Sequence, residues 1–245
     1  MSFPEEVIRK LQTAERIVVL TGAGISAESG VPTFRDAQSG LWANYDPEEL
    51  ATPQAFRRNP RMVWEWYMMR REIIKKVKPN PGHFALAGIE KRVTRFLLVT
   101  QNIDNLHRLA GSENVIEIHG NIQRTKCFDE DVVIDTWDTT DDVPPRCPRC
   151  GGMLRPDVVW FGEMLPSGAF EKSAEAVRNC DVFFSIGTSS LVYPAAALPY
   201  EALNNRILSI EINAEATPLT VHVDHHFRGP AGEILPQLVA AAWRA

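Results

Sequence analysis

The chain has 245 residues, of which 44% are hydrophobic and 23% are charged, a balance typical of a globular protein with a sizeable core. The formal net charge is −5 and no lysine- or arginine-rich run is present, which argues against nucleic acid as a partner. The chain has no apolar run approaching about eighteen residues and no signal-peptide pattern at its acidic start, so we expect a cytoplasmic protein without a membrane partner.

The first predicted elements are a helix over residues 4–14 and a strand over 17–20. The four consecutive aliphatic residues of this strand indicate burial on both faces of a parallel sheet. A strand followed by a Gly-x-Gly turn and a helix start brings backbone N–H groups to a dinucleotide pyrophosphate, and Gly22-x-Gly24-x-x-Ala27 fits this fingerprint. A tight strand-to-helix turn needs glycine even without a phosphate, so the turn alone does not establish a nucleotide site.

The next segment departs from a simple dinucleotide-binding unit, in which a second strand ending in an acidic residue follows after about twenty residues. Residues 34–50 lose periodicity and indicate a long loop beside the glycine turn. Two helical segments follow, over 53–58 and 60–77. The sequence therefore predicts a helical insertion and speaks against an ordinary NAD(P)-dependent dehydrogenase.

The remaining chain alternates helices and strands, which predicts an α/β fold with a Rossmann-type parallel sheet. Polar residues 101–107 follow a strand over 95–100, at the sheet edge where open α/β sheets place ligands. The other predicted elements are helices over 83–91, 168–179, 195–204 and 231–243 and strands over 115–118, 157–161, 181–186 and 207–212.

The cysteines indicate a small inserted module. Cys147 and Cys150 form a Cys-x-x-Cys pair in a chain without an export signal, which favours metal binding or redox chemistry over structural disulfides. Residues 121–156 combine this pair with Cys127, an acidic run, prolines and glycines, and we expect a metal to hold them together. Cys180 is expected to start a strand and to lie in the core.

Short motifs with chemical meaning stand in a specific order along the chain. They are Gly22-Ala23-Gly24-Ile25-Ser26, Pro32-Thr33-Phe34-Arg35-Asp36, Thr100-Gln101-Asn102-Ile103-Asp104, His119-Gly120, Trp160-Phe161-Gly162-Glu163, Gly187-Thr188-Ser189, and Asn213 with Glu215. In this order they resemble the sirtuin family over almost the whole chain. The resemblance implies an NAD-dependent protein-lysine deacylase that acts on acylated-lysine proteins or peptides and releases nicotinamide and O-acyl-ADP-ribose.

The resemblance also implies a division of the chain. A Rossmann-type NAD-binding domain would comprise residues 1–34, 79–120 and 157–245. An inserted small lobe would comprise a helical insertion with the cofactor loop over 35–78 and a zinc-ribbon-like module over 121–156.

The expected catalytic residues are His119, Asn102 and Asp104. Histidine suits the general base because its ordinary pKa of about 6.5 lies near the working pH, and His119 matches the family's catalytic histidine. Asn102 and Asp104 match the pair that orients the nicotinamide amide and a water. The alternative is that all three only cap loops or turns. The other histidines, expected at helix starts, on the surface or in loop packing, are His83, His107, His222, His225 and His226.

The resemblance assigns a larger set of residues to NAD. Phe34 would shield the departing nicotinamide, Arg35 would contact the cofactor from the loop, and Ala231 would lie on the adenine side. The complete predicted cofactor set is Gly22, Ala23, Gly24, Ile25, Ser26, Glu28, Thr33, Phe34, Arg35, Trp42, Gln101, Asn102, Ile103, Asp104, Gly187, Thr188, Ser189, Asn213, Glu215 and Ala231.

Two further groups of residues are predicted to bind the acylated substrate. Val159, Phe161 and Gly162 belong to a segment where the peptide would add as an extended strand. Tyr67 and Arg70 are spaced i, i+3 on a predicted helix and so share one face.

The pattern Trp-Tyr-x-x-Arg around Tyr67 and Arg70 resembles the class III sirtuins, whose acyl pocket accepts negatively charged groups, and Ala55 matches the small residue that widens it. Desuccinylation, demalonylation and deacetylation are therefore expected. The alternative is an amphipathic helix whose Arg70 extends to solvent beside Arg71.

The metal module departs from the family, which usually carries two Cys-x-x-Cys pairs. The first pair here reads Cys127-Phe128-Asp129-Glu130. A carboxylate can ligate zinc, so Glu130 is expected to complete a structural zinc site, with Asp129 or Asp131 as alternatives. Another possibility is that the metal is lost and the acidic loop is solvated. The predicted ligands are Cys127, Cys147, Cys150 and Glu130.

Three other functions share parts of these motifs. A regulator that senses NAD or binds peptides would keep the fold without turnover. An ADP-ribosyltransferase or an NAD hydrolase would share the cofactor half of the site. His119 and Asn102 favour the deacylase.

Overall fold

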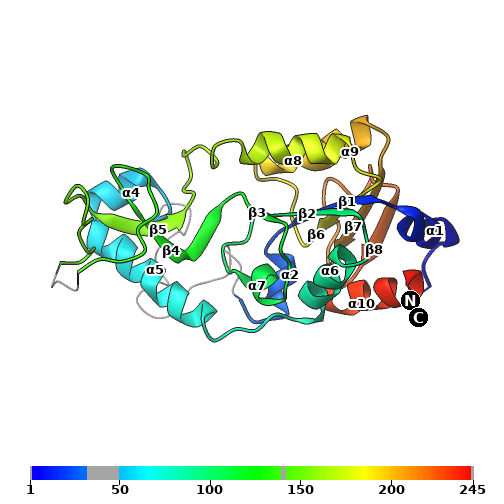
Figure 1. The fold of residues 1–245 in the computed structure, drawn as a ribbon, viewed down its shortest axis with the longest axis horizontal. Helices are drawn as coiled ribbons and strands as arrows, with labels where there is room; N and C mark the ends of the chain where they lie inside the picture. Colours follow the sequence, from blue (N-terminus) through cyan, green and yellow to red (C-terminus); the bar gives the residue numbers. More distant parts are fainter. Residues whose placement is uncertain (1, 32–49, 139–141, 244–245) are drawn as a thin grey trace.

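A six-stranded parallel sheet and a separate two-stranded sheet organise the protein, as the computed structural model shows for residues 2–31, 50–138 and 142–243 (Figure 1). The larger sheet confirms the predicted α/β class. In spatial order its strands are β3 (Val115–Glu117), β2 (Arg95–Thr100), β1 (Arg16–Thr21), β6 (Val182–Ile186), β7 (Leu208–Asn213) and β8 (His225–Arg228).

Strand β1 is central because both of its faces are apolar. Ile17 and Val19 pack into the hydrophobic cluster on one face of the sheet, and Val18 and Leu20 pack into the cluster on the other. The carboxyl ends of β1, β2 and β6 consequently meet at one edge, with Thr21 paired to Thr100 and Ile186.

Helices cover both faces of the large sheet (Figure 1). Apolar side chains from the helices close the two hydrophobic clusters, so this sheet is buried as parallel sheets usually are. The helices are α1 (Glu5–Thr13), α6 (Pro81–Glu90) and α10 (Ala231–Ala242) on one face and α8 (Ala169–Arg178), η2 (Ala195–Ala197) and α9 (Leu198–Asn204) on the other.

The predicted helical insertion consists of α4 (Pro53–Arg58) and α5 (Pro60–Ile74). Each helix begins with a proline behind a capping side chain, since Thr52 accepts from the N–H of Ala55 and Asn59 from that of Met62. Helix α5 ends at Ile74, three residues before the predicted 77.

The two-stranded sheet pairs β4 (Gly120–Cys127) with β5 (Leu154–Val158) in antiparallel orientation. This corrects one prediction: the strand expected over 157–161 lies earlier and joins β4 rather than the large sheet. Arg71 of α5 anchors the register shift in β4, because its Nε donates to the carbonyl of Ile122 at 2.6 Å and its Nη2 to that of Arg124 at 2.8 Å.

Four short elements were not predicted or were predicted with different bounds. They are α2 (Gly24–Ala27), α7 (Leu106–Leu109), η2 and β8. They span three or four residues each, too few for hydrophobic periodicity to develop. Across the described parts of the chain, no helix combines the length and the apolar character that a membrane crossing requires.

Candidate active site

A cavity of about 460 Å³ lies between the carboxyl ends of β1, β2 and β6 and the small lobe formed by α4, α5, β4 and β5. It brings together side chains from all three predicted groups: catalytic, cofactor-binding and substrate-binding. The predicted residues that line it are Gly22, Ala23, Gly24, Ser26, Tyr67, Arg70, Gln101, Asn102, Ile103, Asp104, His119, Val159, Phe161, Gly162, Gly187, Thr188 and Ser189.

Two glycine turns form one wall of this cavity. Gly24 N–H donates to the carbonyl of Gly187 at 2.8 Å, and a Cβ on Gly24 would lie 2.7 Å from Gly187 Cα. Gly187 has φ +60°, and a Cβ there would lie 2.4 Å from the nitrogen of Ile25. Both glycines are therefore required by the close approach of the turns after β1 and β6.

Thr188 joins the ends of three strands. Its Oγ1 accepts from Gln101 Nε2 at 3.0 Å, and its carbonyl accepts from Asn213 Nδ2 at 2.8 Å. Asn213 does not line the cavity, but this bond places it behind the Thr188 turn. The arrangement presents hydroxyl and amide groups at a sheet edge, which fits the polar parts of a dinucleotide.

Half-buried Asn102 forms a polar cluster with buried Ser26 and Asp104. Ser26 Oγ donates to Asp104 Oδ2 at 2.7 Å and accepts from Asn102 Nδ2 at 3.1 Å. Asn102 Nδ2 also donates to the Gly22 carbonyl at 3.1 Å, so its amide oxygen is the group that it offers to a ligand. Burial raises the pKa of Asp104, and hydrogen bonds from Leu106 N–H and Ser26 Oγ oppose that shift.

His83 lies directly behind this cluster, a position that its sequence neighbours did not reveal. Its Nδ1 accepts from Asn80 N–H at 3.3 Å in the first turn of α6, so its Nε2 carries the proton and faces Ser26 Oγ at 3.4 Å. Burial lowers the pKa of His83 to about 4, and it lowers the pKa of neighbouring His107 well below 6.5. Both rings are therefore neutral at pH 7.

His119 faces the cavity with a defined tautomer. Its Nδ1 lies 3.1 Å from the Gln101 carbonyl, which only accepts hydrogen bonds, so Nδ1 carries the proton. Burial lowers the pKa of His119 below 6.5, although the bond to Gln101 opposes the shift. The neutral ring therefore leaves Nε2 as an unprotonated base.

Tyr67 and Arg70 lie together at the small-lobe end of the cavity. Tyr67 is fully buried, and its Oη accepts from the indole N–H of Trp160 at 2.9 Å. Arg70 lines the cavity, with its Cζ 5.3 Å from the ring centroid of Trp66, while Arg71 is buried against β4. Arg71 is therefore buried rather than exposed beside Arg70, and the alternative in which Arg70 itself extends to solvent stays open.

Several predicted residues lie elsewhere. Ala55 is buried beneath the cavity, which Ala51 lines instead. Glu28 Oε2 accepts from Gly232 N–H at 2.7 Å at the start of α10, beside Ala231. Glu215 pairs with Arg228 at 3.1 Å on the surface. Ile25 packs in the core, and four predicted residues fall outside the described part of the chain: Thr33, Phe34, Arg35 and Trp42.

The sequence reasoning missed one wall of the cavity, formed by Val192, Tyr193 and Pro194. Neighbouring Leu191 is 53% exposed and Tyr193 is 70% exposed. These exposed apolar residues follow the Gly187–Ser189 motif and lie outside any helix or strand. Such exposed apolar runs often mark a binding surface, and this one could have indicated the missed wall.

The cysteine module gathers the predicted metal ligands. The ligand atoms of Cys127, Glu130, Cys147 and Cys150 all lie within 4.8 Å of one another, and two of the sulfurs are 3.5 Å apart. A tetrahedral zinc site with Zn–S bonds of about 2.3 Å separates its sulfurs by about 3.8 Å, so this set can hold a metal ion.

The three carboxylates considered for the fourth ligand position, Asp129, Glu130 and Asp131, have different neighbours. Arg149 Nε lies 2.9 Å from Glu130 Oε2, and Lys126 Nζ lies 2.6 Å from Asp131 Oδ1. Asp129 packs against Gly152, where a Cβ would lie 2.0 Å from its Oδ2. Cys180 lies in the core as expected, and burial raises its pKa to about 12.

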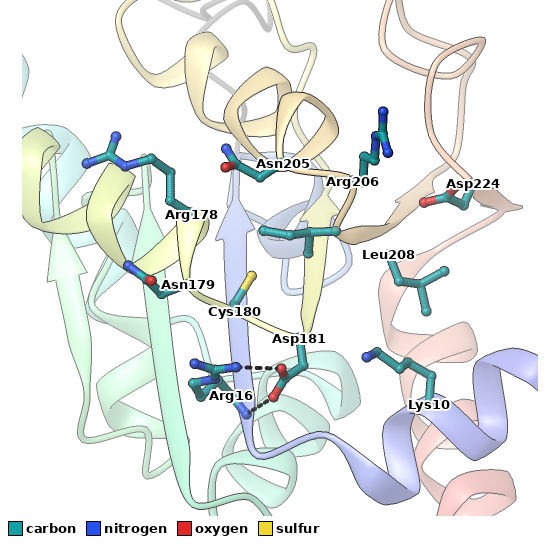
Figure 2. Close-up of a pocket in the computed structure, with 11 residues that line it drawn as sticks. Lys10, Arg16, Arg178, Asn179, Cys180, Asp181, Asn205, Arg206, Leu208 and Asp224 are labelled. Atoms are coloured by element: carbon teal, nitrogen blue, oxygen red, sulfur yellow. Dashed lines mark hydrogen bonds and ion pairs between the residues drawn. The ribbon is translucent and has the colours of Figure 1, made fainter.

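A second hollow, of about 540 Å³, opens at the other end of β1 and β6 (Figure 2). Arg16 is held there by Asp181 at 2.9 Å, whereas Arg178 and Arg206 point apart. None of the predicted site residues lines this hollow.

Comparison with known proteins agrees with this geometry. A profile of the Sir2 family matches residues 22–194. The NAD-dependent protein deacylase of Aquifex aeolicus (strain VF5) is 51% identical over 216 residues, which cover 88% of this chain and 90% of that protein.

Two solved structures extend the comparison to the fold. A Sir2 homologue in complex with NAD is 42% identical with a TM-score of 0.90, covering 98% of this chain and 94% of the other. A complex of Sir2, a p53 peptide and NAD⁺ is 28% identical with a TM-score of 0.83, covering 97% of each chain. This chain belongs to the Sir2 family, the sirtuins.

Proposed function

We propose that this protein is an NAD-dependent protein-lysine deacylase. The observation that carries the proposal is the meeting of the unprotonated Nε2 of His119 and the amide of Asn102 in one cavity with Tyr67 and Arg70. The deacylase name of the Aquifex relative and the NAD complex of the Sir2 homologue support it.

The residues of this chain have separate tasks in that reaction. Bound NAD supplies the ribose carbon that receives the acyl oxygen. His119 Nε2 takes the proton of a ribose hydroxyl, because burial keeps its ring neutral and the Gln101 carbonyl fixes its tautomer. Asn102 orients a carboxamide through its amide oxygen, since both of its N–H groups are donated within the protein. Asp104 holds Ser26, and through it Asn102.

Protein or peptide substrates are supported by the p53-peptide complex of the Sir2 relative. Along the segment proposed to bind peptide, the N–H groups of Val159 and Phe161 already donate to the carbonyls of His119 and Ala51 at 2.9 Å. An added peptide strand would therefore pair with carbonyl groups here or with residues further along the chain. Main-chain pairing of this kind gives loose sequence selectivity.

The acyl pocket is proposed to prefer succinyl and malonyl groups while still accepting acetyl. Burial raises the pKa of Tyr67, so the phenol stays protonated and can donate to a carboxylate. Arg70 supplies the cation that a carboxylate removed from water requires.

Replacing Arg70 by methionine should separate the two substrate classes. Loss of a charge-assisted hydrogen bond costs roughly 1.5–3 kcal/mol, so kcat/KM for a succinyl-lysine peptide should fall about 10- to 100-fold. For the acetyl-lysine peptide, kcat/KM should change less than about threefold, because the acetyl methyl group makes no ionic contact. Equal losses for both peptides would contradict the charged pocket.

Mass spectrometry of a succinyl-lysine peptide tests the proposed function directly. With NAD present, the enzyme should remove the acyl group and release nicotinamide in equal amounts. Nicotinamide release without acyl loss would identify an NAD hydrolase, and a gain of ADP-ribose on the peptide an ADP-ribosyltransferase. NAD binding without any turnover would identify a regulator.

The cysteine module is proposed to hold a structural zinc ion through Cys127, Cys147, Cys150 and Glu130. The mutual proximity of their ligand atoms supports Glu130 as the fourth ligand over Asp129 and Asp131. The division into a Rossmann-type domain and an inserted lobe, and the cytoplasmic location, stay predictions.

A further inference from the structure

Trp160 is a buried aromatic residue that lines the same cavity as Tyr67 and Arg70. Its side chain is 1% exposed, it lines the cavity, and its indole Nε1 donates to Tyr67 Oη at 2.9 Å. The Tyr67 hydroxyl, which is proposed to bind the acyl carboxylate, is thus itself held by a second residue.

The orientation of the Trp160 ring is fixed from several sides. Its backbone N–H donates to Glu163 Oε2 at 2.8 Å, and the same carboxylate accepts from Arg155 Nη2 at 2.9 Å. The Arg155 guanidinium stacks on the indole, with Cζ 3.2 Å from the ring centroid. Phe56 packs against the ring at 5.3 Å between centroids. The indole N–H is therefore aimed at Tyr67 without a competing partner among these contacts.

The hydrogen-bonding capacity of a phenol decides what this contact does. A phenol has one O–H donor and accepts through its oxygen lone pairs. Trp160 has only a donor, so it must occupy an acceptor position of Tyr67 Oη. The phenolic proton cannot point at Trp160 and is left to donate in another direction. Tyr67 is one of the residues that line the cavity, so an anionic acyl group bound there would be the natural acceptor for that proton.

We propose that Trp160 is a positioning residue for acyl selectivity: its indole N–H turns the Tyr67 phenolic proton toward the terminal carboxylate of a succinyl or malonyl group. This inference rests on the proposed anionic acyl pocket. An acetyl group has no terminal carboxylate to accept a hydrogen bond from that proton, so Trp160 acts on one substrate class only.

Kinetics of Trp160→Phe, Tyr67→Phe and the double variant test the inference. Phenylalanine keeps an aromatic ring for Arg155 and Phe56 but removes the N–H. For a succinyl-lysine peptide we expect KM to rise about fivefold in Trp160→Phe with kcat nearly unchanged. KM for the acetyl-lysine peptide should stay within about twofold. In the Tyr67→Phe background, Trp160→Phe should have no further effect on the ratio of the two KM values.

The matched control is Trp243→Phe, which removes an indole N–H at the far end of α10. Trp243→Phe should leave the ratio of the KM values for the succinyl-lysine and acetyl-lysine peptides unchanged. Equal effects of Trp160→Phe on both peptides, or an undiminished effect in the Tyr67→Phe background, would overturn the role of Trp160 while leaving the pocket intact. Absence of desuccinylation by the wild type, or no selectivity change in Arg70→Met, would contradict the pocket itself and this inference with it.

A second measurement does not depend on the folding of Trp160→Phe. The chain has six tryptophans, so a ¹H–¹⁵N spectrum of the full-length protein resolves a small set of indole N–H signals. Trp66 also contacts the Tyr67 ring, so the indole signal that moves most in Tyr67→Phe is assigned to the indole bonded to Tyr67 Oη. It should also move when the succinyl-lysine peptide is added, and less with the acetyl-lysine peptide. A signal that responds equally to both peptides would overturn the inference.

Discussion

Replacement of His119 by alanine is expected to lower kcat/KM for every acylated peptide by about 10²- to 10⁴-fold, the usual contribution of a general base. His119 Nε2 is the unprotonated ring nitrogen of a side chain that lines the cavity. The Gln101 carbonyl holds the other nitrogen, so no second tautomer has to be displaced before the proton is taken. Steady-state deacylation, followed by mass spectrometry, measures the loss.

The pH profile of the wild type gives an independent check on His119. A base must be unprotonated, so activity is lost as the pH falls through its pKa. Burial lowers the pKa of His119, and the acidic limb of kcat/KM should therefore have its midpoint below 6.5. The exposed His222 provides the control, because His222→Ala should keep both the rate and the profile. An acidic limb centred above 6.5, or near-normal turnover in His119→Ala, would contradict the assignment.

The elements that could be predicted from the sequence are those in which one local pattern suffices. Strand β1 carries an apolar run that has no alternative to burial on both faces, and α4 begins at a proline behind the capping Thr52. The predicted bounds of α4 agree with the structure because proline and cap mark its start, and Asn59 caps the next helix immediately.

The position of β5 required information that lies outside its own residues. The run from Leu154 to Phe161 is apolar over most of its length and does not show where pairing stops. Pairing with β4 across a register shift sets those limits, and that shift is stabilised by Arg71, which lies 51 residues before its hydrogen-bond partner Ile122. Local periodicity has no access to such a contact.

The candidate site was predictable mainly at cavity-lining residues that belong to the sequence motifs, whereas the wall at Val192, Tyr193 and Pro194 was missed. The motif around Asn102 and His119 reports the side chains that face the cavity, because those follow strand ends directly. The hydrogen bonds from His83 to Ser26 and from Trp160 to Tyr67 join residues far apart in the sequence, and neither contact was predicted. These contacts depend on how α5 and α6 pack in three dimensions, and the spacing of residues along the chain does not predict that packing.

Replacement of Cys147 by alanine is expected to destabilise the small lobe far more than the same change at Cys180. Removing a ligand from a structural zinc site forfeits part of a binding energy that reaches about 10 kcal/mol or more in small zinc modules. A loss of about 3–5 kcal/mol would lower Tm by about 10 °C in a chain of this size. Cys180 is buried outside the cluster, so Cys180→Ala should cost about 1 kcal/mol and lower Tm by about 2–4 °C.

Metal analysis of protein prepared without a histidine tag connects this difference to zinc. The wild type and Cys180→Ala should each hold about one equivalent of zinc, and Cys147→Ala well under half an equivalent. Less than about a tenth of an equivalent in the wild type would rule out a structural zinc.

Loss of the metal should also affect the acyl pocket. Trp64 of α5 packs in one cluster with Cys127 and Cys147, and the next turn of α5 carries Tyr67. Desuccinylation should therefore be impaired more strongly than NAD binding in Cys147→Ala, because NAD binding depends on the distant glycine turns at Gly24 and Gly187.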